Sequence, residues 1–256
     1  MYLKKIVLVL LLSFAFYYCM QKMTVQPLKT YTQAHFDTTR KPIVLWDIHH
    51  VILQKDYRAL AHILWCCDTK KKIVRNSSWA MVKDMLVGLY DMCLGGSTAE
   101  VFATIARTYG NKDFADLVTQ LANSQSLIPE TALLIHDLHA QGYRQHIGSN
   151  IGATIFENLL TKPQVQTIFN ANIFELNASQ LVTYYPDGIH ATIKKPQHAF
   201  YYAYLEKNNL TAQQVVFIDD KYENVLAAQQ CGMYALQFKN ASQLRADLRI
   251  LLGLTL

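Results

Sequence analysis

Lys41-Pro-Ile-Val-Leu-Trp-Asp-Ile-His-His-Val-Ile52 is the stretch that decides the interpretation of this chain. Its apolar residues 43–45 predict a short strand that is buried on both faces. Pro42 fits the first position of such a strand, where a missing N–H removes no ladder hydrogen bond. The run ends at a carboxylate, Asp47. Because ligands bind beyond the carboxyl ends of strands in an open parallel sheet, Asp47 is a candidate for chemistry.

A second strand of the same kind lies far downstream, in Val215-Val-Phe-Ile-Asp-Asp220. On its own, an acid after a strand is usually a turn residue. Two buried strands that both end in acids, however, bring Asp47, Asp219 and Asp220 to one edge of a sheet. Such carboxylates repel one another unless a cation is bound between them. The sequence therefore predicts a cation site at this edge.

Composition restricts the function classes. The chain has 256 residues, of which 51% are hydrophobic and 17% charged, as in a globular protein. The net charge of +5 comes from scattered lysines and arginines without a basic stripe, so we expect no nucleic-acid partner. The five cysteines are odd in number and match no zinc spacing, and no disulfide framework is implied. The oligomeric state is left open.

The N-terminal segment is the most hydrophobic part of the chain. Lys4 and Lys5 precede a run of apolar residues at 6–20, which at about 1.5 Å per residue is shorter than the ~30 Å bilayer core. This pattern is typical of a signal peptide, and we interpret residues 1–23 as an export signal or membrane anchor. The protein is then exported or membrane-anchored, whereas a helix buried in the fold would leave it cytoplasmic. Polar residues 24–40 are interpreted as a linker.

The next ninety residues have a helical pattern. Apolar residues recur at helical spacing, Ser97 begins a capping box for a helix at 98–109, and Pro129 begins a later helix. No strand-like alternation is present. We therefore expect residues 53–140 to form an all-helical module inserted into another domain.

Strands and helices alternate over the rest of the chain. Residues 144–148 predict one strand, 172–175 a further strand and 180–193 a β-hairpin. Alternation of this kind predicts a three-layer α/β fold with a Rossmann-like parallel sheet. We expect residues 41–52 and 141–256 to form this core together.

Four sites follow one another at the ends of the predicted strands: Asp47, Ser149, Lys195 and the Asp219-Asp220 pair. In this order they resemble the four motifs of the haloacid dehalogenase (HAD) superfamily. The most specific piece is Phe217-Ile-Asp-Asp-Lys-Tyr-Glu-Asn-Val225, which is similar to the fourth motif. The likeness covers most of the chain after residue 40, and the insert at 53–140 resembles the helical C1 cap of that family.

The resemblance implies a Mg²⁺-dependent phosphatase acting on a small phosphomonoester. Asp47 would attack phosphorus and form an aspartyl-phosphate, which divides hydrolysis into two steps. Ser149 and Asn150 would donate hydrogen bonds to the phosphoryl oxygens, and Lys195 would neutralise charge on the nucleophile and the phosphoryl group.

The same resemblance assigns the metal ligands. Asp47, Asp219 and Asp220 would hold Mg²⁺, and the backbone carbonyl of His49 would complete the site. The cap would close over the leaving group and exclude water.

His49 departs from the family pattern, because family phosphatases usually carry a second Asp at this position. Histidine can serve as a general acid and base, since its unperturbed pKa of about 6.5 is close to neutral pH. Two alternatives follow from the departure. One is a catalytically weak or inert binding protein. The other is a 2-haloacid dehalogenase, whose chemistry needs no acid at this position but has no use for the Asp219-Asp220 pair.

Overall fold

The computed structural model describes residues 27–31, 40–55, 77–93, 104–151, 153–181 and 193–254. The chain divides into two units, Met1–Thr30 and Tyr31–Leu256, and the second contains the helices and strands described below. The expected signal or anchor at 1–23 and the Ser97 capping box lie outside the described residues. Within the described ranges, no helix has the length and apolar character needed to cross a membrane.

The centre of the fold is a parallel sheet. Its strand order is β5-β4-β1-β6-β7, and all four neighbouring pairs run parallel. The strands are β1 (Ile43–Trp46), β4 (Gln145–Ser149), β5 (Gln180–Leu181), β6 (Val215–Asp219) and β7 (Tyr234–Gln237). β1 is the middle strand and all of its residues are buried, because its apolar side chains point to covered faces on both sides. The predicted Rossmann-like α/β core is confirmed.

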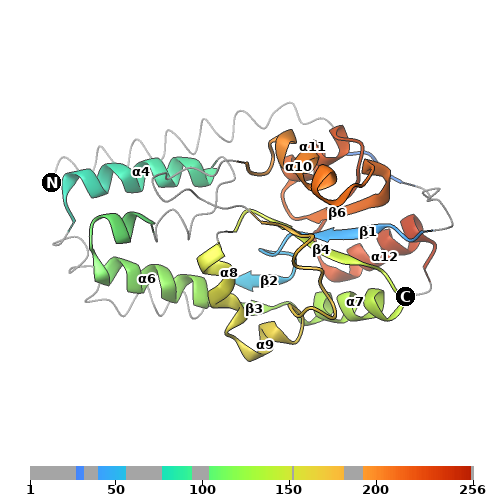
Figure 1. Cartoon of the computed structure of the whole chain (residues 1–256), viewed down its shortest axis with the longest axis horizontal. Helices are drawn as coiled ribbons and strands as arrows, with labels where there is room; N and C mark the ends of the chain where they lie inside the picture. Colours follow the sequence, from blue (N-terminus) through green and yellow to red (C-terminus); the bar gives the residue numbers. More distant parts are fainter. Residues whose placement is uncertain are drawn as a thin grey trace. The chain divides into compact units, whose positions relative to one another are not determined.

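Helices cover both faces of this sheet. The elements after the insert are α7 (Pro129–Ala140), α8 (Ala153–Leu160), α9 (Pro163–Gln166), α10 (His198–Asn208), η1 (Ala212–Gln214), α11 (Tyr222–Gln230) and α12 (Ala241–Leu252). α11 packs on β6 and β7 and contacts α10, whereas α12 packs on β7 and contacts α7. Figure 1 shows α10 and α11 on one side of the strands and α7 and α12 on the other. These are the three layers that the sequence predicts.

The register of the sheet brings the acids together. Trp46 is paired with Ile218 of β6 and with Ile147 of β4. Asp47 therefore follows the last pair, and its N–H still donates to the Ile218 carbonyl at 2.8 Å. The next residue of β6 is Asp219, so both acids leave the sheet at the same level. This placement follows from parallel pairing alone.

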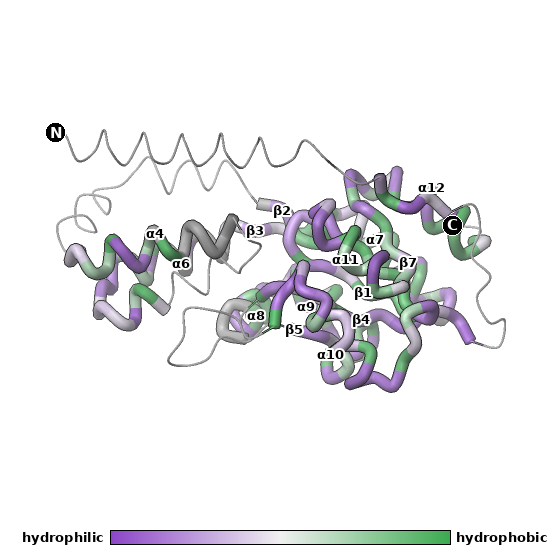
Figure 2. The backbone as a smooth tube through the Cα atoms, turned by 90° about the horizontal axis from the view of Figure 1, so that it is seen from above, coloured by the Kyte–Doolittle hydropathy of each residue, from purple (hydrophilic) through white to green (hydrophobic). Residues whose placement is uncertain are grey.

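Two helices of the insert are described, α4 (Trp79–Cys93) and α6 (Lys112–Asn123), and residues 104–108 are also helical. The first turns of α4 contain both hydrophobic and hydrophilic positions in Figure 2. A small apolar cluster packs these segments together; its buried members are Met81, Ile105, Ala106 and Phe114. Tyr109 adds a polar link, since its hydroxyl donates to Asp84 at 2.6 Å.

The insert is not all-helical, and that expectation was wrong. β2 (Leu53–Lys55) pairs antiparallel with β3 (Gln125–Leu127). Three residues are too few to show an alternating pattern, and the partner strand lies some seventy residues away in the sequence. The paired strands lie where the chain leaves the core and where it returns.

α7 was assigned to the insert from the sequence, but it packs with the core. Its side chains Leu134, Ile135 and Leu138 belong to the same buried apolar cluster as β1, and the helix contacts α12. The division of the chain into a core and a cap, with their limits, stays a prediction.

Residues 172–175 do not form the strand that their apolar side chains predicted. The side-chain oxygen of Asn170 accepts the N–H groups of Asn172 and Ile173 at 3.1 and 3.3 Å, which favours a turn over an extended strand. Phe174 is still buried, from within this turn. The expected hairpin lies largely outside the described residues, and its first part, β5, pairs parallel with β4.

Candidate active site

Asp47 lies at the end of the central strand and is 5% exposed. The Ser149 hydroxyl donates a 2.7 Å hydrogen bond to its Oδ1, and the Lys195 ammonium lies 2.9 Å from the same oxygen. Burial works against ionisation of this carboxyl, but Lys195, the nearby His49 and the Ser149 hydroxyl together hold its pKa below the ordinary value. These contacts favour the ionised form of Asp47, which is the form that a nucleophile needs.

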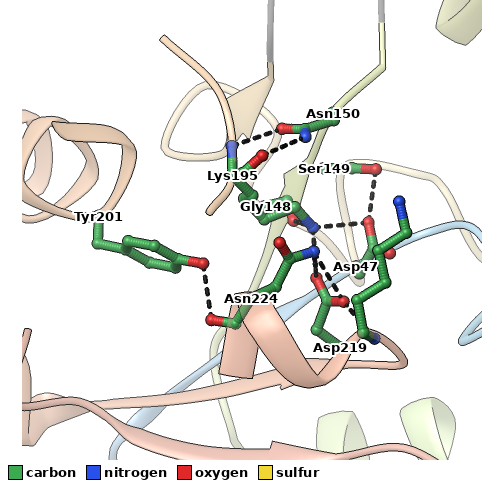
Figure 3. Close-up of polar contacts among 9 residues, drawn as sticks. Asp47, Gly148, Ser149, Asn150, Lys195, Tyr201, Asp219 and Asn224 are labelled. Carbon is green, nitrogen blue, oxygen red and sulfur yellow. Dashed lines mark hydrogen bonds and ion pairs between the residues drawn. The ribbon is translucent and has the colours of Figure 1, made fainter. Parts of the chain in front are cut away.

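Lys195 is the central cation of the site and is buried. Besides Asp47, its Nζ contacts Oδ2 of Asp219 at 2.6 Å and the carbonyl oxygen of Gly148 at 2.7 Å (Figure 3). Burial opposes the charged form, but the two carboxylates outweigh it and raise the pKa of Lys195. The ammonium thus joins the ends of β1, β4 and β6 through one charged group.

Asn150 holds the Lys195 backbone in place. Its side-chain oxygen accepts the N–H of Lys195, and its amide donates to the Lys195 carbonyl, both at 2.9 Å (Figure 3). The expected hydrogen bond from Asn150 to a phosphoryl oxygen stays a prediction, because both polar side-chain atoms already have these backbone partners. In the structure, the Asn150 amide fixes where the lysine enters the site.

Asn224 is a residue of the site that the sequence analysis quoted within the 217–225 motif without giving it a role. It lies on α11, is buried, and donates to both oxygens of Asp219 at 3.0 and 2.9 Å. The Tyr201 hydroxyl donates to the Asn224 carbonyl at 2.7 Å (Figure 3). The position of Asn224 in the 217–225 motif was the only feature of the sequence that pointed to a functional role, since a single Asn in a helix forms no recognisable pattern.

Asp219 is almost saturated with hydrogen-bond donors. It accepts from Lys195, from the Lys221 N–H at 2.8 Å and twice from Asn224, and an ionised carboxylate offers about four acceptor sites. Asp220 differs, because its side chain makes no hydrogen bond to the described part of the chain. Asp47 and Asp220 are thus better placed to bind an added ion, while Asp219 mainly positions Lys195.

The three acids form a compact cluster. One ligand oxygen from each of Asp47, Asp219 and Asp220 lies within 4.8 Å of the other two. Burial and the neighbouring Asp47 raise the pKa of Asp219 to about 7, and the same two causes raise the pKa of Asp220. When all three carboxyls are ionised, the single ammonium of Lys195 leaves two negative charges, and a divalent cation would relieve this repulsion.

His49 follows Asp47 by two residues, in a tight loop. The N–H groups of Ile52 and Leu53 both donate to the Ile48 carbonyl, and His50 has a positive φ of 63°. Nδ1 of His49 lies 2.7 Å from Oε1 of Gln125. Burial is the largest influence on the His49 imidazole and lowers its pKa, although Asp47 acts in the opposite direction.

Gln125 was missed by the sequence interpretation. It belongs to β3 and its side chain is buried. A glutamine in a short polar segment carries no recognisable pattern, so the contact with His49 depended on a strand pairing that the sequence did not reveal.

Comparison with known proteins identifies the family of the chain. Residues 85–237 match the family described as haloacid dehalogenase-like hydrolase, which is more than half of the sequence. The chain belongs to the haloacid dehalogenase-like hydrolases. Within the matched range lie Ser149, Lys195, Asp219 and Asp220, whereas Asp47 precedes it.

Two curated relatives of the chain come from Aspergillus. The sesquiterpene phosphatase AstK of Aspergillus oryzae is 30% identical over 124 residues, which are 47% of this chain and 55% of AstK. The drimenol cyclase DrtB of Aspergillus calidoustus is 27% identical over 195 residues, or 74% of this chain and 34% of DrtB. The chain thus spans about half the length of the first relative and a third of the second.

Solved structures of haloacid dehalogenase-like enzymes share the fold. A HAD family enzyme of Bacteroides thetaiotaomicron, BT-2542, crystallised with magnesium and inorganic phosphate, has a TM-score of 0.51 at 16% identity and covers 78% of this chain and 95% of that one. A dehalogenase structure has a TM-score of 0.52 at 14% identity, covering 83% and 98%. At these identities the likeness shows the fold alone.

Proposed function

We propose that this chain is a Mg²⁺-dependent phosphatase that works through an aspartyl-phosphate on Asp47. The observation that carries the proposal is the cluster at the sheet edge: an ionised aspartate that contacts a buried ammonium, with two further acids beside it. A phosphate monoester is anionic, so an anionic nucleophile can approach it only where positive charge is concentrated.

The donor set fits Mg²⁺. Its three carboxylates supply only oxygen ligands, the type this hard cation prefers, and the cluster carries an excess of negative charge. Asp47 and Asp220 would hold the ion with Asp219 beside them, and the His49 carbonyl stays a predicted fourth ligand. When bound, Mg²⁺ supplies positive charge that offsets the phosphoryl oxygens.

The chain's own residues account for the bonds that change. Asp47 attacks phosphorus as the ester P–O bond breaks, and the leaving oxygen takes a proton from the imidazolium form of His49. In the second step water attacks phosphorus and gives its proton to the neutral His49, and the Asp47 carboxylate is released with inorganic phosphate. Lys195 and Ser149 orient the nucleophile through Oδ1, and His49 is the proton carrier beside it.

Hydrolysis of p-nitrophenyl phosphate tests the proposal. We expect release of p-nitrophenol that requires Mg²⁺, stops on addition of EDTA and falls at least a thousandfold in Asp47→Asn. Turnover that survives Asp47→Asn would exclude an aspartyl-phosphate. Halide release from 2-haloacids in EDTA would instead support the dehalogenase alternative. Binding of a phosphate mimic without either turnover would support the inert binding protein.

The relatives favour one substrate class within this proposal. We propose that the substrate is a phosphate ester of a terpenoid, because one relative is named a sesquiterpene phosphatase and another a drimenol cyclase. The test compares farnesyl phosphate with glycerol phosphate at equal concentration. A higher kcat/KM for farnesyl phosphate is expected, and equal or reversed values would exclude this preference.

A further inference from the structure

Gln125 is held firmly at the point where the chain returns from the insert to the core. In the β2–β3 pair it lies opposite Lys55. Its backbone carbonyl accepts a 3.1 Å hydrogen bond from Nζ of Lys162, the residue just before α9. Two elements therefore fix its backbone, and its buried side chain is directed to His49.

The contact between the two side chains has a defined direction. Oε1 of Gln125 is an amide oxygen and can only accept a hydrogen bond. The Nδ1 atom of His49, 2.7 Å away, must then carry the proton and donate it. In a neutral imidazole only one ring nitrogen carries a proton, so Nε2 keeps its lone pair. Nε2 makes no hydrogen bond to any residue that the structure describes.

We propose that Gln125 is a positioning residue that fixes His49 in the tautomer protonated on Nδ1, so that Nε2 is the atom that exchanges protons in the reaction. The inference rests on the proposed function for the role of His49, while the tautomer itself is a property of the resting protein. A strand of the insert thereby sets the orientation of a side chain two residues from the nucleophile. This is the usual function of a hydrogen-bonded partner behind a reacting histidine.

The first test is spectroscopic and needs no turnover. The full chain is labelled with ¹⁵N on its histidine rings, and the His49 signals are identified by their loss in His49→Asn. At a pH where the ring is neutral, we expect a protonated Nδ1 and an unprotonated Nε2 in the wild type. Gln125→Leu should lose this preference, whereas Gln125→Glu, which retains an acceptor oxygen, should keep it. Gln54→Leu is the matched control, since Gln54 is exposed on β2 of the same strand pair.

The second test is kinetic, with the aryl phosphate above. Gln125→Leu should lower kcat about tenfold while KM changes less than twofold, and Gln125→Glu should restore part of the loss. An unprotonated Nδ1 in the wild type would overturn the inference. So would a Gln125→Leu variant with the wild-type tautomer and kcat. The expected tautomer in a wild type that shows no turnover would support the positioning contact and remove the phosphatase proposal instead.

Discussion

Both carboxylate oxygens of Asp219 accept hydrogen bonds from the side-chain amide of Asn224, at 3.0 and 2.9 Å. These bonds hold Asp219 against Lys195, whose ammonium lies 2.6 Å from Oδ2. Lys195 in turn contacts Asp47, the proposed nucleophile. Asn224 is therefore linked to Asp47 through two other side chains.

Replacing Asn224 by Ala should lower activity without removing a reacting group. We expect kcat to fall 10- to 100-fold, as for other partners behind a reacting or ligating residue. The free energy of unfolding should fall by about 2 kcal/mol, because a buried carboxylate loses two donors. Urea unfolding and steady-state kinetics measure the two effects.

The control for this variant is Asn208→Ala. Asn208 donates to the carbonyls of Ala178 and Tyr204 at 2.9 and 2.8 Å and has no contact with the acid cluster. It should lose stability while kcat stays near the wild-type value. Equal activity in Asn224→Ala and Asn208→Ala would show that Asp219 does not depend on Asn224.

Removing the buried ammonium should have the largest effect. In Lys195→Met the carboxylates of Asp47 and Asp219 lose their shared cation, and breaking a buried ion pair costs about 3–5 kcal/mol. We expect loss of detectable phosphatase activity and a lower midpoint in urea. The control is Lys207→Met, because the Lys207 ammonium donates to the Ser179 carbonyl at 2.7 Å and not to an acid of the cluster. Activity above a tenth of wild type in Lys195→Met would contradict the role given to this residue.

The sequence was sufficient to place Asp47 and Asp219 together, because parallel strands end at a shared edge of the sheet. Two buried apolar runs that stop at Asp47 and Asp219 are enough to place these acids side by side, and the register confirms it. Gln125 could not be found in this way, since β3 is short and its partner β2 is distant in the sequence. At 172–175 the hydrogen bonds of Asn170 outweighed the apolar pattern. Local side-chain bonds of this kind depend on rotamers that a pattern of residue types does not specify.

Magnesium should stabilise the folded protein if the acid cluster binds it. A ligand that binds only the native state adds about 2.7 kcal/mol of stability at a hundred times its Kd. We expect Mg²⁺ to raise the Tm of the wild type in a concentration-dependent way, and this shift should be lost in Asp220→Asn. The control is Asp137→Asn, whose carboxylate forms a surface ion pair with Arg245 at 2.9 Å. If Mg²⁺ raised the Tm of Asp220→Asn as much as that of the wild type, the ion would bind at another place.

His146, a residue of β4 near the site, makes the stability of the folded protein depend on pH. The imidazole is buried, and Nδ1 lies 2.8 Å from the Tyr204 hydroxyl. Burial lowers the pKa of His146 to about 4, while Glu175 opposes this and Arg144 and Lys207 add to it. The unfolded chain, with a pKa of about 6.5, therefore binds a proton before the folded protein does. The contribution of His146 to the free energy of unfolding is fully present above pH 6.5 and is lost as the pH falls toward 4.

The expected loss from His146 is about 2 kcal/mol between pH 6.5 and pH 4. Urea unfolding at pH 7.0, 5.5 and 4.5 measures it, on the wild type and on His146→Gln. The variant should have a lower free energy of unfolding at pH 7.0 but a smaller decrease on acidification, because its side chain does not titrate. His198→Gln, at an exposed position on α10, should keep the wild-type slope. An unchanged dependence of stability on pH in His146→Gln would show that other groups cause the acid sensitivity. Asp219 and Asp220 are not among them, because carboxyl groups with raised pKa values stabilise the folded protein as the pH falls.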